Sequence, residues 1–339
     1  MNVTELSQHI THQDIAPLYL VVGEEAYLQQ AAREQFLKIL PTDERDLNLG
    51  QYDLNETSLA TALADAMSMP FLGERRVVFL NSPVFLTSEK SKIEQPVNEL
   101  IDYLQAPTPT TALVIFAPYA KLDERKKVVK LLRQRAVIID TAKLSEQAAR
   151  EAFQYELKKQ HLKITSQALQ LLIQRTDADF SLMMAQLTKL ALYAQSSHEI
   201  DQVAVTRLVT AKLEDNVFDL VNAVLNRKVK LALEQYQMLI LQQEDPIKLN
   251  AVLLNQFRLL LQVKILQAKG YTQGTLATKL KVHPYRIKLA LRQVKKFSKD
   301  DLIHAYLGLE KLEVGMKSSQ MDRRMLFELF VLHFAKYKH

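Results

Sequence analysis

The sequence predicts an α/β domain built on a parallel sheet, followed by an all-helical region, and three observations support this prediction. Glycine accounts for only 7 of the 339 residues, roughly 2% against a usual ~7%, which argues against a β-sandwich or a barrel. Eight of the ten prolines precede residue 120, and proline collects in the connections between short elements. Several short apolar runs lie in the same part of the chain, as buried strands of a parallel sheet require.

The predicted strands and helices alternate over the first 140 residues. Strands are expected at 18–22, 77–80, 113–116 and 137–139, with a weaker candidate at 47–54. Helical patterns lie between them, at 27–40, 58–69, 93–104 and 123–135. Such alternation is typical of βαβ units in an open parallel sheet. After residue 140 only helices are expected: two that begin near Ser145 and Thr165, then 180–193, 203–210, 217–225, 231–242, 247–268, 275–280, 285–297, 299–311 and 325–337.

The composition excludes several classes of site. The chain has no cysteine, so disulfides, thiolate zinc sites and thiol nucleophiles are excluded, and a reducing cytoplasm is the expected location. No uninterrupted apolar run approaches the ~18–20 residues that span a bilayer, and the N-terminus lacks a signal-peptide pattern. We therefore expect a cytoplasmic protein with no membrane partner. The sequence also lacks grouped carboxylates for the two-metal chemistry of a polymerase, so no catalytic residue, metal or cofactor is predicted.

The turn after the first predicted strand decides whether the domain binds a nucleotide. A P-loop needs the pattern G-x-x-x-x-G-K-[ST], because backbone amides, the lysine and the hydroxyl hold the phosphates and magnesium. Here the strand is followed by Gly23, Glu24 and Glu25, so the lysine is missing and two carboxylates would repel phosphate. Strand 77–80 is followed by Asn81 and Ser82, which lack the carboxylates that hold metal and water. The two glutamates are expected instead at a helix N-terminus, where acidic side chains are favourable.

An apolar step follows the predicted helix 58–69. The helix ends at Pro70, because the residue before a proline resists α geometry. The step consists of Met69, Pro70, Phe71 and Leu72, and strand 77–80 comes shortly after it. Two interpretations are open: the side chains fold back under the edge of the sheet, or they are exposed and bind a partner. The stripe of the preceding helix that is expected to face the core consists of Leu59, Leu63, Ala66 and Met67.

Positive charge is concentrated in one segment of the helical region. Residues 251–300 contain 11 basic residues and one acidic residue, a net charge of +10, whereas residues 1–150 contain 16 and 20, a net charge of −4. The stretch 271–288 fits a helix-turn-helix, so one hypothesis is a DNA-binding regulator that uses the basic segment 270–297. The other is a pair of packed helices with a solvated basic face. The candidate DNA contacts are Lys279, Lys281, Arg286, Lys288, Arg292, Lys295 and Lys296.

Four segments carry a resemblance to a known family. They are 18–28 (LYLVVGEEAYL), 69–78 (MPFLGERRVV), 121–127 (KLDERKK), and the stretch 244–286 that runs from EDP through QFR to HPYR. Taken together and in this order, they resemble the delta subunit of the bacterial DNA polymerase III clamp loader. The resemblance spans nearly the whole chain, so it is specific as a set although no single motif is.

The resemblance implies a division into three domains. The first is an AAA+-like α/β domain at 1–141 with a degenerate nucleotide site. The second is a small helical lid domain at 142–211, and the third is a helical collar domain for oligomerisation at 212–339. It also implies that this chain does no catalysis of its own.

The resemblance further implies a mechanical function in DNA replication. An apolar element of the family binds the sliding clamp and opens the ring for loading onto primed DNA. In this chain that element falls on Phe71 and Leu72, with Met69 and Pro70 beside them, which favours the exposed interpretation. Which two of the four enter the clamp stays open. The implied partners are the clamp, the motor subunits that hydrolyse ATP and a delta-prime-like subunit bound through the collar, with primed DNA contacted indirectly or weakly.

Overall fold

A computed structural model describes residues 1–11, 15–210 and 213–336. The chain forms two compact units. One unit comprises Met1–Phe153 and Asp179–Ala185, and the other comprises Gln154–Ala178 and Gln186–His339. The three domain boundaries derived from the resemblance stay predictions.

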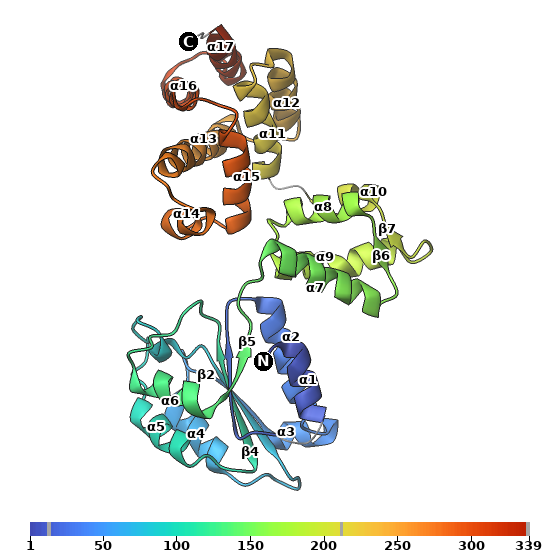
Figure 1. Ribbon diagram of the computed structural model, residues 1–339, viewed down its shortest axis with the longest axis vertical. Helices are drawn as coiled ribbons and strands as arrows, with labels where there is room; N and C mark the ends of the chain where they lie inside the picture. Colours follow the sequence, from blue (N-terminus) through green and yellow to red (C-terminus); the bar gives the residue numbers. More distant parts are fainter. Residues whose placement is uncertain (12–14, 211–212, 337–339) are drawn as a thin grey trace. The chain divides into compact units, whose positions relative to one another are not determined.

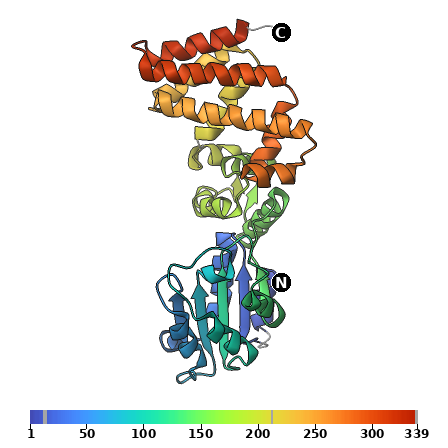
Figure 2. The same cartoon turned by 90° about the vertical axis from the view of Figure 1, so that its left-hand side faces the viewer.

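The first unit is organised around one five-stranded sheet, whose strands all point the same way (Figure 2). Its order is β2-β3-β4-β1-β5, and every neighbouring pair is parallel. This order and the helical C-terminal region confirm the predicted AAA+-like fold class. The strands are β1 Leu18–Val22, β2 Leu49–Asp53, β3 Arg76–Asn81, β4 Thr111–Ala117 and β5 Val137–Asp140.

Helices cover both faces of this sheet (Figure 1). Neighbouring residues of a strand point to opposite faces, so Leu20 packs in one core and Val21 in the other. Both faces are therefore apolar, which explains the continuous apolar runs in the sequence. The helices on one face are α4 Leu59–Met67, α5 Val97–Gln105 and α6 Lys127–Arg135, and those on the other are α1 Val3–Thr11 and α2 Ala26–Leu37.

Three short helical segments in the connections were not predicted. They are η1 Thr42–Glu44, α3 Arg45–Asn48 and η2 Val84–Leu86. Helix α3 takes the first residues of the weak strand candidate 47–54, so β2 begins only at Leu49. A single helical turn carries no periodic pattern, which is why the sequence did not indicate it.

The rest of the chain is almost entirely helical. Its helices are α7 Glu146–Lys159, α8 Ser166–Arg175, α9 Phe180–Tyr193, α10 Gln202–Leu208, α11 Leu213–Leu225, α12 Val229–Leu241, α13 Pro246–Ala268, α14 Gln273–Leu280, α15 Pro284–Val294, α16 Lys299–Ser318 and α17 Arg323–Lys336. The prediction of helices alone after residue 140 was wrong at one place. Strands β6 Lys163–Ile164 and β7 Glu199–Ile200 pair in parallel, and two-residue strands are too short to show alternation in a sequence.

Helix α13 is the centre of the C-terminal helical core. It packs against α11, α15 and α16, and Leu253, Phe257 and Leu260 on it are fully buried. By length and composition alone α13 could cross a membrane. Long core helices of helical bundles meet the same criterion, and the buried apolar residues of α13 belong to the apolar cluster of the C-terminal helices. Its helical neighbours therefore account for its apolar character.

Candidate functional site

Two candidate sites lie at opposite edges of the sheet. The loop 68–75 precedes β3, so it lies at the amino ends of the parallel strands. Gly23 follows β1, and Ser82 follows β3, so the candidate nucleotide site lies at the carboxyl ends. The two sites share no residue and are described separately.

The apolar side chains of the loop 68–75 are exposed. Met69 and Leu72 each expose 86% of their surface and Phe71 exposes 56%, whereas Pro70 is half-buried. The arrangement in which Phe71 and Leu72 fold back under the sheet is therefore wrong. Large apolar groups presented together at the surface are typical of binding sites for other proteins.

An ion pair closes the base of this loop. Asp65 lies near the end of α4, and Arg76 is the first residue of β3. The Arg76 guanidinium pairs with the Asp65 carboxylate, and its second nitrogen donates to the Leu47 carbonyl at 3.3 Å. Arg75 donates to the Pro109 carbonyl at 2.9 Å. The two ends of the loop are thus held by charged side chains while its apolar ones stay in solvent.

Two further apolar residues at this edge are exposed, and the sequence did not indicate them. Met67 was predicted to face the core, but it exposes 59% of its surface. At ~100° per residue it lies about 80° from Leu59 around the helix, at the edge of the buried stripe, and α4 ends there. Leu47, the neighbour of the loop's hydrogen-bond partner Asn48, is also exposed. The sequence did contain a signal for the exposure of Met67: the helix has to end before Pro70, so Met67 lies in its last turn.

At the other edge, two backbone amides of the turn after β1 are engaged within the chain. The Gly23 amide donates to the Ala117 carbonyl at 3.1 Å, and the Glu25 amide donates to the Thr141 carbonyl at 2.9 Å. The Gln29 side chain donates to the Gly23 carbonyl and to the Thr141 hydroxyl. The turn is thus closed onto the segment that follows β5.

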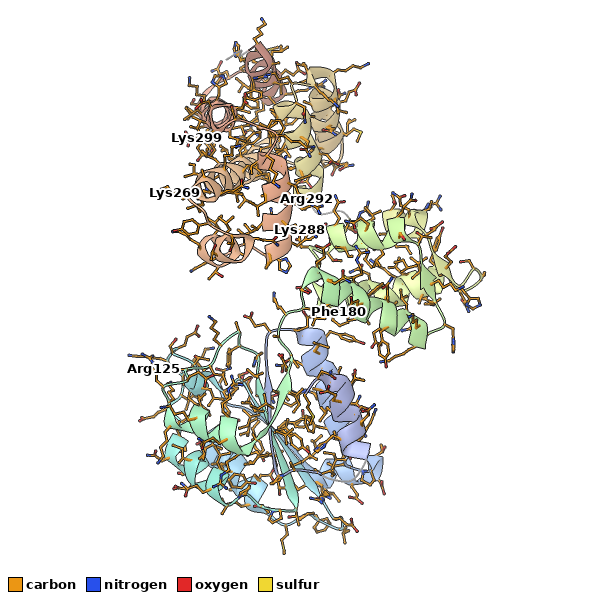
Figure 3. All side chains as sticks on the ribbon, viewed as in Figure 1. Arg125, Phe180, Lys269, Lys288, Arg292 and Lys299 are labelled. Atoms are coloured by element: carbon orange, nitrogen blue, oxygen red, sulfur yellow. The ribbon has the colours of Figure 1, made fainter. Side chains whose placement is uncertain are left out.

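The Glu25 side chain is buried and binds the start of another helix. Glu25 is the N-cap residue of α2, at the helix N-terminus that the sequence predicts, but its carboxylate makes no capping hydrogen bond there. Instead it accepts hydrogen bonds from the Ser181 amide, at 2.9 Å, and from the Ser181 hydroxyl, at the start of α9. The Tyr27 amide donates to the same hydroxyl at 2.8 Å. The Tyr27 ring meets the ring of Phe180 edge-on, and Phe180, the first residue of α9, is labelled in Figure 3. Glu24, by contrast, is exposed.

The Glu25 carboxyl makes the stability of the folded protein depend on pH. Burial raises the pKa of its carboxyl above the ordinary 4.5, and the nearby Asp179 adds to this, while hydrogen bonds from Ser181 and the charge of Lys143 act against it. A raised carboxyl pKa means that the folded state binds this proton more tightly than the unfolded state. The free energy of unfolding therefore falls as the pH rises from 4.5 through the raised pKa of Glu25, and it changes no further once the carboxyl is ionised in both states.

We expect Glu25→Gln to be more stable than the wild type at pH 7.5, because the amide keeps an acceptor for Ser181 without the buried charge. The difference should shrink as the pH falls toward 4.5. Thermal unfolding of both proteins across this pH range measures the effect. A difference that does not change with pH would show that the charge of Glu25 carries no such cost.

Asn81 and Ser82 also have partners within the chain, and the Ser82 carbonyl accepts from the Val84 amide at 2.8 Å. The Arg33 guanidinium donates to the Asn81 side-chain carbonyl, and the Asn81 amide donates to the Tyr52 carbonyl at 3.3 Å. Arg33 lies over the rings of Phe79 and Phe116, at 4.8 and 4.2 Å, and burial lowers its pKa. A cation next to Asn81 opposes the binding of a metal ion there. Among the residues that the structure describes, no group of three or more His, Asp or Glu side chains could hold a metal.

The basic residues of 270–297 lie on α14, α15 and the segments next to them. Lys288 and Arg292 lie one turn apart on α15 (Figure 3). Arg286 is turned inward and donates to Gln256 of α13 at 3.5 Å. Lys279 donates to the Tyr271 hydroxyl at 2.8 Å. The remaining three are exposed: Lys281, Lys295 and Lys296.

These two helices form the predicted helix-turn-helix, but two of the first three residues of α15 are turned toward the helical core. Tyr285, the second residue of α15, is buried, and Arg286 contacts α13. A recognition helix needs exposed polar side chains at its start to reach base edges. The geometry of α15 therefore gives the DNA-binding regulator no support.

The chain matches two family models. Residues 19–142 match the model described as "DNA polymerase III, delta subunit", and residues 214–334 match its "C-terminal domain". Among curated proteins, the DNA polymerase III subunit delta of Bacillus subtilis is 37% identical over 95% of this chain and 94% of the relative. The probable delta subunit of Aquifex aeolicus is 22% identical over 93% of this chain and 90% of the relative.

A solved structure supports the same family assignment. The Bacillus subtilis DNA clamp loader delta protein matches with a TM-score of 0.75 and 36% identity, covering 99% of this chain and all of the other. The identity, the coverage and the two family models agree, and none of them supports a regulator of the helix-turn-helix class. The chain belongs to the DNA polymerase III delta subunit family of clamp-loader proteins, whose work is DNA replication.

Proposed function

We propose that this chain binds the sliding clamp through Met69–Leu72 and holds the ring open while it is loaded onto primed DNA. The observation that carries the proposal is the exposure of Met69, Phe71 and Leu72 in a loop that is fixed at its base. Exposed apolar groups on a fixed backbone suit insertion into an apolar pocket, because little ordering is needed on binding.

The proposed mechanism requires a difference between two affinities. A protein shifts a ring between closed and open forms only by as much as it binds the open form more tightly. The apolar loop would therefore bind the clamp beside one of its interfaces and stabilise the arrangement in which that interface is parted. Such a subunit needs no chemistry of its own, since the energy for the cycle comes from motor subunits that hydrolyse ATP.

The geometry at the carboxyl edge of the sheet supports a non-catalytic subunit. The amides of Gly23 and Glu25 are engaged with Ala117 and Thr141, and the Glu25 carboxylate is buried in the same turn. Nucleotide binding would require these hydrogen bonds to break and a buried anion to meet a second one.

Titration of the chain with magnesium and ATP should therefore give no saturable heat, corresponding to a Kd weaker than about 1 mM. Isothermal titration calorimetry makes the measurement, with one of the motor subunits as the positive control. A saturable signal in the micromolar range would contradict the proposal of a degenerate site.

The C-terminal region is proposed to join this chain to the motor subunits and to a delta-prime-like subunit as a collar at 212–339, with the lid at 142–211. Exposed apolar side chains on one side of α12 support a protein interface there; they are Leu231, Met238 and Leu241. The exposed lysines and Arg292 around α15 would add weak, salt-sensitive contact with primed DNA. All of this takes place in the cytoplasm.

Co-purification tests the proposal as a whole. A tagged form of the chain should retain both the sliding clamp and the motor subunits when they are expressed together. A preparation that retains the motor subunits but never the clamp would contradict the proposed clamp binding. Retention of neither would also remove the proposed collar.

A further inference from the structure

One buried side chain holds the backbone of Phe71 through two hydrogen bonds. Asn48, the last residue of α3, is fully buried. Its amide nitrogen donates to the Phe71 carbonyl at 2.9 Å, and its oxygen accepts from the Phe71 amide at 2.7 Å. Both polar groups of one residue in the loop are thus fixed by a residue 23 positions earlier in the chain.

The backbone next to these two hydrogen bonds has a conformation that an isolated peptide rarely adopts. Leu72 has a φ of 53°, in the left-handed region that residues with side chains rarely adopt. Such conformations persist only where the surroundings determine them, and they are common where proteins hold ligands. Gly73 packs closely behind: a Cβ on it would overlap the Glu44 carboxylate and lie 3.1 Å from the Asn48 nitrogen.

Asn48 and the apolar side chains of the loop differ sharply in burial. Asn48 has no access to solvent, while Met69 and Leu72 are the most exposed apolar side chains of the loop. A buried amide needs its hydrogen bonds satisfied, so Asn48 and the Phe71 backbone stabilise one another in a single arrangement. Fixing a binding loop in advance lowers the entropy lost on association.

We propose that Asn48 is a positioning residue for clamp binding: its two hydrogen bonds to Phe71 hold the apolar loop in the conformation that enters the clamp. This inference rests on the proposed function of Met69–Leu72. Asn48 itself touches no partner; it acts through Phe71 and Leu72.

The test is the affinity for immobilised sliding clamp, measured by surface plasmon resonance with the full chain. Asn48→Ala removes both bonds, and Asn48→Asp keeps the acceptor but loses the donor to the Phe71 carbonyl. Each should weaken binding about tenfold. The matched control is Asn250→Ala, which removes another buried asparagine that donates to the Leu309 carbonyl in the C-terminal core. It should lower thermal stability without changing clamp affinity.

A double variant separates positioning from a general loss of structure. In the background of Phe71→Ala, Asn48→Ala should cost less affinity than it does in the wild type, because the part of its effect that acts through the Phe71 side chain is gone. An equal loss in both backgrounds, or an unchanged affinity for both Asn48 variants, would overturn the inference. If Phe71→Ala and Leu72→Ala both leave the affinity unchanged, the proposed function fails and not the positioning role alone.

A measurement on the unmodified chain covers the case in which the Asn48 variants do not fold. Amide hydrogen exchange should show protection of the Phe71 amide in the free protein, although the loop is exposed, because that amide is bonded to a buried oxygen. Exchange of Phe71 as fast as that of an unstructured peptide would show that the grip is absent in solution and would overturn the inference.

Discussion

Phe71→Ala is expected to weaken binding of the sliding clamp by about 2 to 4 kcal/mol, roughly 30-fold to 700-fold in Kd. Large apolar side chains that fill a pocket at the centre of an interface contribute most of the binding energy. Phe71 is 56% exposed in the free chain, so its removal leaves little cavity and should hardly change the free energy of unfolding. Surface plasmon resonance on immobilised clamp gives the affinity, and urea denaturation gives the stability.

The control for this prediction is an equally exposed apolar residue elsewhere. Leu192 on α9 is 68% exposed, and Leu192→Ala should leave the clamp affinity unchanged. Single alanine variants of Met69 and Leu72 then rank the loop residues and show which two enter the clamp. Wild-type affinity for Phe71→Ala and Leu72→Ala alike would refute the proposed binding element.

Gly23→Ala is expected to destabilise the α/β unit by about 3 kcal/mol or more, although only one methyl group is added. Gly23 has a φ of 139°, which residues with a side chain rarely adopt. A methyl group there would overlap the backbone of Thr141 and Ala142, and backbone atoms cannot rotate away as a flexible side chain can. The hydrogen bonds that close this turn onto β5 would have to break.

Urea denaturation monitored by circular dichroism measures this effect. Gly274→Ala is the matched control, because it lies in the first turn of α14 with nothing within 4 Å of the added methyl group. Alanine favours helix over glycine by up to about 1 kcal/mol, so this variant should be neutral or slightly more stable. Equal stability of Gly23→Ala and the wild type would mean that the turn after β1 is not closed as described.

Much of the fold was readable because apolar patterns are local. The four strong strand predictions at 18–22, 77–80, 113–116 and 137–139 each overlap a strand of the sheet, and the predicted helix 180–193 has the bounds of α9. Burial on both faces produces a continuous apolar run, and burial on one face of a helix produces a stripe with a 3.6-residue repeat. Elements of two to four residues, such as α3 and β6, are too short to show either pattern.

The features of the candidate sites also divide into those that the sequence could predict and those that depend on the fold. The apolar composition of Met69–Leu72 and the missing lysine after Gly23 are properties of short segments, so the sequence determined them, and the resemblance gave them their meaning. Whether the loop faces solvent depends on how α4 ends and on which groups lie behind it. The sequence therefore left two arrangements open, and the fold showed that Met69, Phe71 and Leu72 are exposed.

By itself, the sequence determined the parallel α/β domain, the helices that follow it and a turn after the first strand that lacks the P-loop lysine. Only the tertiary structure decided that Asn48 grips Phe71, and that Glu25 binds Ser181 rather than the end of its own helix. These partners lie 23 and 156 positions apart in the chain. A buried polar side chain takes its partner from whatever the folded chain brings within hydrogen-bond distance, and no local pattern records that choice.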